Sequence, residues 1–88
     1  MNTIKTNELK KGDWIKLRNG WTGEVWDNRR GNTRVVDVYG DYHEAGSIYA
    51  HDIVAKLDTG PTGGKQIAHI EHTPAQLKLR RSVAAFGW

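Results

Sequence analysis

Apolar and polar residues alternate along the opening part of the chain with the two-residue period of β-strands. In the first run, Ile15 and Leu17 share one face, which we expect to be the inner face of a small β-barrel. The opposite, outer face carries polar and aromatic side chains, which are Trp14, Lys16 and Arg18 on the first run and Thr22, Glu24 and Trp26 on the second.

Turn-forming residues separate these runs. Asn19-Gly20 lies between the first two runs, and both residues tolerate the positive φ of a type I′ turn. The pattern therefore predicts a β-hairpin over residues 12–27. Residues 2–11 are mostly polar and are interpreted as a lead-in, with Leu9 as a core contact.

Further short runs of β-branched and aromatic residues predict more strands. We place them at Thr33–Tyr39, Ser47–Ala50 and Ile53–Leu57, with a possible sixth strand at Gln66–Glu71. Strands this short, joined by tight loops, are typical of a small barrel. The predicted fold class is mainly β, an SH3-like barrel of five or six strands with one C-terminal α-helix.

The hydrophobic period changes near the end of the chain. Thr73 is a suitable N-cap, Pro74 suits the first helical position, and Gln76 completes a capping box. Beyond them an apolar stripe is formed by Leu79, Val83 and Phe86. A helix of this length is marginal alone, so we expect it to dock on the barrel, on a partner chain or on a target.

Three parts follow from this pattern. Residues 1–58 are assigned to the barrel, residues 59–66 to a glycine-rich linker, and residues 67–88 to a strand and helix extension. The extension is expected to pack on the barrel or on a partner protomer.

Composition restricts the class of protein. The 88 residues suit one small domain, and the absence of cysteine excludes disulfides and thiolate metal sites. No apolar run resembles a signal peptide or a membrane span, so we expect a soluble intracellular protein without membrane contact.

The net charge of +3 is unevenly distributed. Residues 1–64 hold nine Lys/Arg and nine Asp/Glu, whereas residues 65–88 hold four Lys/Arg and one Asp/Glu. The positive excess therefore belongs to the C-terminal quarter, where a predicted helix carries Lys78, Arg80 and Arg81.

Trp14 and Trp26 are the first candidate site residues, because both are expected on the outer face of the hairpin as a cross-strand pair. Such a pair could stack on bases while Lys16, Arg18 and Arg34 hold phosphates. Alternatively, the terminal helix or its linker covers both rings and the pair is structural. The burial of the two indoles distinguishes these alternatives.

Basic residues form the second candidate set. They are Arg29 and Arg30 on a predicted loop, with Lys78, Arg80 and Arg81 on the predicted helix. Together they could bind phosphates, or they could simply be a solvated basic face.

Catalytic and metal chemistry find little support. His69 and His72 would point to opposite faces of a strand, and no third ligand accompanies them. His51-Asp52 is an adjacent pair at a predicted turn, where backbone bonding is the simpler role. No nucleophile with a partner base is evident, so we expect a non-enzymatic protein without metal or cofactor.

The block Lys11-Gly12-Asp13-x-Ile15-x-Leu17-x-x-Gly20-x-x-Gly23-Glu24-Val25 resembles a KOW-type motif. That motif opens an SH3-like barrel in certain transcription elongation factors and ribosomal proteins. The resemblance implies a barrel, while the loop with which family members contact RNA or protein is reduced here to Asn19-Gly20.

A second resemblance covers more of the chain. It is carried by Asn19-Gly20-Trp21, Asp27-Asn28, Gly31-Asn32-Thr33-Arg34, Val38-Tyr39-Gly40 and Gly46-Ser47-Ile48-Tyr49-x-His51-Asp52-Ile53. These segments are similar to small proteins of tailed bacteriophages, which implies a phage origin and an accessory or host-directed role.

The sequence thus predicts a non-enzymatic phage accessory protein that binds host or phage nucleic acid, or the host machinery that handles it. The alternative is a homo-oligomeric host-defence antagonist that binds a host protein or sequesters a nucleotide signal. A role as a virion component comes third.

Overall fold

A computed structural model describes residues 2–27 and 33–85, with side chains described as far as residue 82. Within these ranges the chain is mainly β, as predicted, with one C-terminal helix. The strands are β1 (Asn2–Lys5), β2 (Trp14–Leu17), β3 (Thr22–Asp27), β4 (Thr33–Tyr39), β5 (His43–Tyr49), β6 (Ile53–Leu57) and β7 (Gln66–Glu71). Two 3-10 helices, η1 (Thr6–Glu8) and η2 (Ala50–Asp52), and the helix α1 (Pro74–Ala85) complete the fold.

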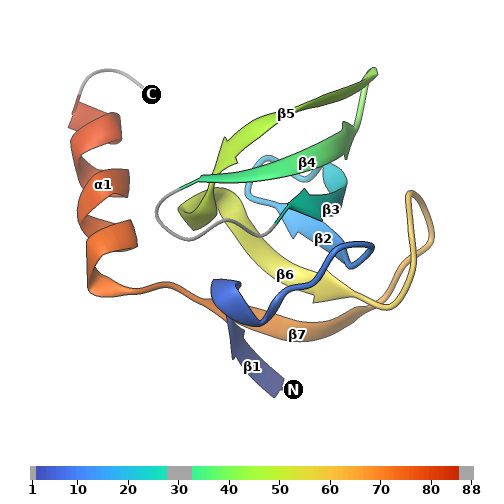
Figure 1. Cartoon of the computed structure of the whole chain (residues 1–88), viewed down its shortest axis with the longest axis horizontal. Helices are drawn as coiled ribbons and strands as arrows, with labels where there is room; N and C mark the ends of the chain where they lie inside the picture. Colours follow the sequence, from blue (N-terminus) through green and yellow to red (C-terminus); the bar gives the residue numbers. More distant parts are fainter. Residues whose placement is uncertain (1, 28–32, 86–88) are drawn as a thin grey trace.

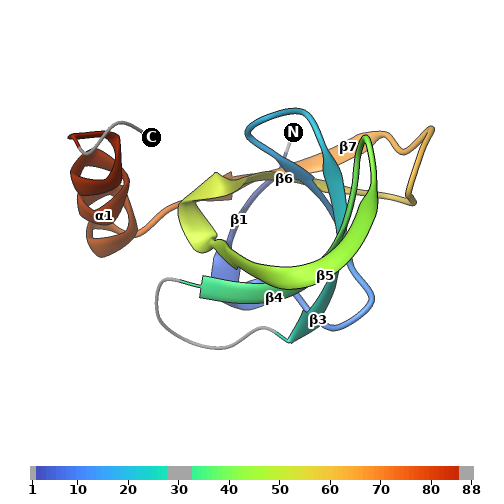
Figure 2. The same cartoon turned by 90° about the horizontal axis from the view of Figure 1, so that it is seen from above.

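The strands form one curled sheet in the order β1-β7-β6-β2-β3-β4-β5 (Figures 1 and 2). All described pairings are antiparallel except that of β1 with β7, which is parallel. The sheet is not closed, because β1 and β5 are its edges. Seen from above, it curves around a central core, and α1 lies to one side (Figure 2).

The core lies inside the curl and is built from the alternating apolar positions. Ile15 and Val25 come from the first hairpin, Val36 from β4 and Ile53 from β6, and each is 1% exposed or less. Leu9, which the sequence predicted as a core contact, is also buried. The two-residue period therefore identified the inner face of the first hairpin correctly.

The first hairpin is confirmed, but its predicted turn is wrong. The amide of Gly20 donates to Leu17 O, and the amide of Leu17 donates to Trp21 O, which makes a three-residue loop. Gly20 has a φ of +94°, whereas no described residue other than glycine has a positive φ. This is a type I turn followed by a left-handed glycine, in which Asn19 instead accepts the Trp21 amide through its side chain.

Strand boundaries were predicted well in the middle of the chain and poorly at the sheet edges. β4, β6 and β7 match their predicted ranges. Residues 2–5, predicted as a lead-in, form β1, and residues 43–46, predicted as a loop, begin β5. Both are edge strands whose pairing depends on a distant partner or a single neighbour, so local composition indicated them weakly.

Residues 59–66, assigned to a linker by composition, lie mostly in the loop of the β6–β7 hairpin, and Gln66 begins β7. Asp58 closes the base of the loop by accepting the Lys65 amide at 2.7 Å. The loop folds onto the first hairpin, where Thr22 Oγ1 donates to Pro61 O at 2.8 Å. A Cβ placed on Gly60 would lie 2.2 Å from the Trp14 ring, so the loop packs directly on that indole.

The start of α1 follows its predicted capping box. Thr73 Oγ1 accepts the Gln76 amide at 3.2 Å, and Gln76 Oε1 accepts the Thr73 amide at 2.9 Å. The helix contacts η2, which anchors it beside one corner of the sheet (Figure 1). Among the described residues, no helix combines the length and apolar character needed to cross a membrane.

Candidate functional site

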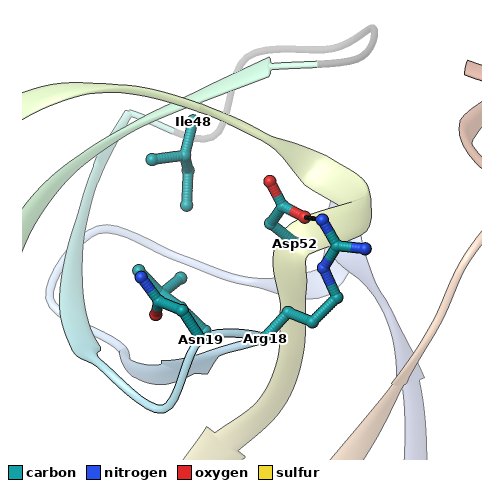
Figure 3. A pocket seen from close by; sticks show the side chains of 5 residues that line it. Arg18, Asn19, Ile48 and Asp52 are labelled. Carbon is teal, nitrogen blue, oxygen red and sulfur yellow. Dashed lines mark ion pairs between the residues drawn. The ribbon is translucent and has the colours of Figure 1, made fainter. Parts of the chain in front are cut away.

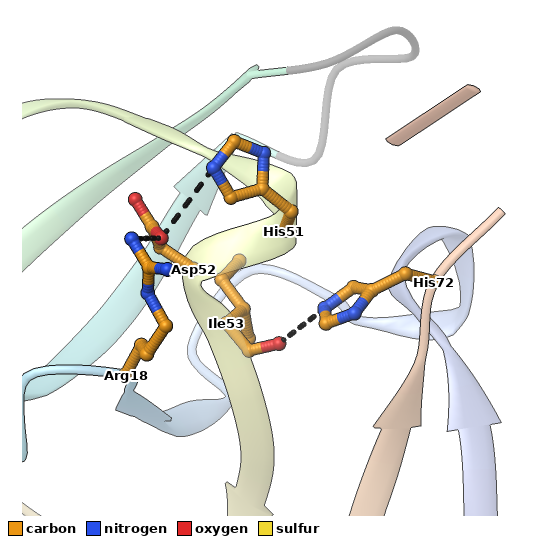
Figure 4. A network of polar contacts seen from close by, with 5 residues as sticks. All are labelled: Arg18, His51, Asp52, Ile53 and His72. Atoms are coloured by element: carbon orange, nitrogen blue, oxygen red, sulfur yellow. Dashed lines mark hydrogen bonds and ion pairs between the residues drawn. The ribbon is translucent and has the colours of Figure 1, made fainter. Parts of the chain in front are cut away.

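Polar side chains from distant parts of the chain meet at η2 (Figure 4). An ion pair joins Arg18 Nη2 to Asp52 Oδ1 at 3.0 Å, and the Arg18 amide donates to Asp52 O at 2.8 Å. On the other side of the corner, His72 Nε2 donates to Ile53 O at 2.8 Å. These contacts fix the β2–β3 loop, η2 and the segment leading to α1 relative to one another.

His51 is the buried member of this corner. Its side chain is 1% exposed, its Nε2 lies 3.5 Å from Asp52 Oδ1, and its ring stacks on Tyr49 at 5.1 Å. Within the described residues, its Nδ1 has no hydrogen-bond partner. Adjacent His51 and Asp52 thus converge more closely than the sequence suggested.

Burial lowers the pKa of His51 below its ordinary value of 6.5. The Asp52 carboxylate raises this pKa, whereas the positive charges of Arg18, His72 and Arg80 lower it. The net direction is downward because loss of hydration outweighs the carboxylate.

This pKa predicts a pH-dependent stability. Because the folded pKa lies below the unfolded value of 6.5, the unfolded chain binds more protons as pH falls through that value. We expect the thermal midpoint to drop between about pH 7 and about pH 5, and to drop less in His51→Gln, which cannot take up that proton. Thermal unfolding at several pH values measures this, and identical pH profiles for the two proteins would refute it.

A pocket opens beside the corner (Figure 3). It has a volume of about 230 Å³ and is lined by Leu17, Arg18, Asn19, Ile48 and Asp52. A larger and more open hollow of about 440 Å³ next to it shares Ile48 and Asp52 and adds Thr33, Ser47 and Tyr49. The two hollows form one concave region with an apolar wall and charged groups at its rim.

The basic helix lies next to this region. α1 contacts η2, and Asp52 of η2 lines both hollows. Lys78, Arg80 and Arg81 are all exposed on α1. We call Arg18, the pocket and the basic residues of α1 the basic corner.

The predicted pair of Trp14 and Trp26 is wrong. Trp14 lies opposite Glu24 in the hairpin register, and its ring contacts Tyr39 at a centroid distance of 5.4 Å. Tyr39 in turn stacks on His43 at 4.2 Å. Trp14 is half-buried beneath the Gly60 loop, so the structural alternative, cover by the linker, describes this ring.

Trp26 is exposed, as predicted, with 53% of its surface accessible. Its indole N–H donates to Asp37 Oδ2 at 2.6 Å, and the Lys11 ammonium lies 6.0 Å from its ring centroid. A bulge in the β3–β4 pairing occurs between Val25 and Asp27 and tilts this end of the strand. The carboxylates of Glu24 and Asp37 share its face of the sheet, so this aromatic surface is not basic.

Arg34 is not on the outer face. Arg34 lies two residues before Val36 in β4, so both side chains are on the inner face of the sheet, and Arg34 is 1% exposed. Its Nη1 donates to Thr33 O and its Nη2 to Asn7 Oδ1, both at 2.7 Å, and burial lowers its pKa. A side chain held this way is not placed to hold a phosphate on the outer surface.

Arg29, Arg30 and Phe86 lie outside the described residues, so their predicted roles stay predictions. Across residues 2–27 and 33–85, no group of three His, Asp or Glu side chains is arranged to hold a metal ion.

Sequence reasoning missed four of the five residues that line the pocket, which are Leu17, Asn19, Ile48 and Asp52. Asn19 was interpreted only as a turn residue, and Asp52 only as a backbone-bonding one. One sequence signal for the pocket was available: Arg18 directly follows a predicted strand, and Asp52 directly precedes another. Which loops meet depends on the curl of the sheet, and local pattern does not show that.

Comparisons with known proteins add nothing to this picture, since no family model, curated protein or solved structure matches the chain.

Proposed function

We propose that this protein is a non-enzymatic module that binds single-stranded nucleic acid at the basic corner. The observation that carries the proposal is that Arg18 is paired with Asp52 of η2 at the edge of a concave region, while the basic helix α1 contacts η2 as well. Arg18 and the basic residues of α1 are far apart in the sequence and are brought to the same corner by η2. A hollow with a guanidinium at its edge, close to a basic helix, suits a strand whose phosphates and bases are both accessible.

The distribution of charge supports the corner over the Trp26 surface. Most of the positive excess lies on α1, next to the corner, whereas Trp26 is tied to the Asp37 carboxylate. Phosphates would be repelled by Glu24 and Asp37 but attracted by Arg80 and Arg81. Arg18 remains 44% exposed despite its ion pair, so its guanidinium stays accessible to a strand.

The proposal also includes a more detailed interpretation of the fold. We interpret the curled sheet as an SH3-like barrel opened by a KOW-like hairpin, with an accessory role in a tailed bacteriophage and a site of action in the host bacterial cytoplasm. The resemblances in the β2–β3 hairpin and around η2 support it.

A second candidate function is binding of a host protein through Trp26, as in the alternative of a host-defence antagonist. The specific observation is an exposed indole held in place by its own hydrogen bond, since exposed and pre-ordered tryptophans are typical anchors of protein interfaces. The acidic neighbours of Trp26 suit a protein partner better than a phosphate backbone.

An NMR titration tests the proposed function. A single strand of about 12 nucleotides is added to labelled protein, and shifts in amide signals are mapped. We expect the largest shifts at Arg18, Asn19, Ile48, Asp52 and along α1. Shifts confined to the Trp26 surface, or no shifts at any concentration, would contradict the proposal.

A further inference from the structure

The pocket lined by Leu17, Arg18, Asn19, Ile48 and Asp52 is the smaller and more enclosed of the two hollows. Its volume is about 230 Å³, below the range of about 300–1,000 Å³ that drug-sized ligands occupy. Leu17 and Ile48 give it an apolar wall, which suits the face of an aromatic heterocycle. Its remaining lining residues, Arg18, Asn19 and Asp52, are polar and belong to two separate loops.

Asp52 supplies an acceptor. Its Oδ1 faces Arg18 Nη2 at 3.0 Å and His51 Nε2 at 3.5 Å. Its second oxygen points away from Arg18, toward the side of the pocket on which Ile48 lies (Figure 3). The ion pair thus orients the carboxylate while leaving one oxygen directed into the pocket.

Asn19 supplies a donor across the pocket from Asp52. Its Oδ1 accepts the Trp21 amide at 3.0 Å, which fixes the orientation of the side-chain amide. The NH₂ end must then point the other way, and Figure 3 shows it facing the space beneath Ile48. The turn that the sequence indicated therefore also presents a fixed donor to the pocket.

We propose that this pocket receives one unpaired guanine base of the bound strand, an inference that rests on the proposed function. Guanine presents a carbonyl acceptor beside two adjacent donors, its ring N–H and its amino group. The free oxygen of Asp52 accepts from those donors, and the Asn19 amide donates to the guanine carbonyl. The ring lies against Leu17 and Ile48.

The other bases fit this arrangement less well. Thymine and uracil place a second carbonyl next to their N–H, where it meets the Asp52 carboxylate. Adenine and cytosine place an unprotonated ring nitrogen next to their amino group, which the carboxylate also repels. Guanine is the base that faces a carboxylate with donors alone.

The test measures, by fluorescence anisotropy, the affinity of the protein for four short thymine strands. These strands differ only in their central base, which is guanine, adenine, cytosine or thymine. Wild-type protein is expected to bind the guanine strand about tenfold more tightly than the others. Asp52→Asn should reduce this ratio to about twofold or less. The control Asp41→Asn changes an exposed carboxylate outside the pocket lining and should keep the full ratio.

Asn19→Asp provides a second variant of nearly the same shape. It keeps the oxygen that accepts the Trp21 amide but replaces the donor with an acceptor, so the guanine preference should again be lost. The ratio between strands is the readout for both variants, because it is independent of a change in overall affinity. A guanine preference that persists in both variants would overturn the assignment of the pocket.

The failures of the two proposals are distinguishable. Equal binding of all four strands by wild-type protein overturns the guanine inference and leaves the proposed function standing. If no strand binds, the proposed function fails, and a titration with guanosine monophosphate decides the pocket separately. Movement of the Asn19 side-chain amide signals would then support the inference, and their absence would overturn it.

Discussion

Replacing Ile15 with alanine is expected to lower the free energy of unfolding by about 2–5 kcal/mol. Ile15 is fully buried, and its partner across the hairpin is Gly23. A Cβ on Gly23 would lie 3.5 Å from Ile15 Cγ1, so the isoleucine side chain packs over bare backbone. Paired backbone cannot collapse into the space left by a smaller residue, so most of the cavity should persist.

This loss is large for a small domain, whose total stability is about 5–15 kcal/mol. Urea unfolding followed by circular dichroism measures it. Ile67→Ala is the matched control, because Ile67 is 43% exposed on β7 and should lose about 1 kcal/mol or less. Equal losses in the two variants would contradict the placement of the core.

Replacing Arg80 and Arg81 together with glutamine is expected to weaken binding of single-stranded DNA about 25-fold at about 0.1 M salt. Each phosphate contact on a single strand adds about 0.7 to the slope of log affinity against log salt. Loss of two contacts should therefore reduce that slope by about 1.4. Glutamine has nearly the helix propensity of arginine, so α1 should remain folded.

The control for this change is Lys10→Gln with Lys65→Gln. It removes the same two charges from exposed positions, one ahead of β2 and one in the β6–β7 loop. Because neither position belongs to the basic corner, the loss of affinity should stay within about threefold, as expected for screened charges. A loss equal to that of the arginine variant would mean that only net charge matters.

The inner face of the sheet could be predicted because it depends on local alternation. Ile15 and Val25 of the first hairpin were placed by the period alone, and the capping box at Thr73 indicated the start of α1. β1 could not be predicted this way, since three of its four residues are polar and its hydrogen bonds go to β7, at the other end of the chain.

The candidate site was predicted only in part, for physical reasons that differ between residues. Arg34 shares the inner face of β4 with Val36, yet its charge suggested a position on the surface. Burial is possible because Asn7 and Thr33 O accept its N–H groups, and no local signal indicates that. The pocket arises where curling of the sheet brings Arg18 to Asp52, a tertiary event that strand patterns do not encode.

The most direct test of the central claim is the affinity of wild-type protein for a mixed-sequence single strand between about 50 and 200 mM salt. The basic corner predicts measurable binding that weakens steadily with salt, with a log–log slope of about −2.8, as four contacts from Arg18, Lys78, Arg80 and Arg81 would give. Absence of binding at the lowest salt, or binding that does not change across the range, would contradict it.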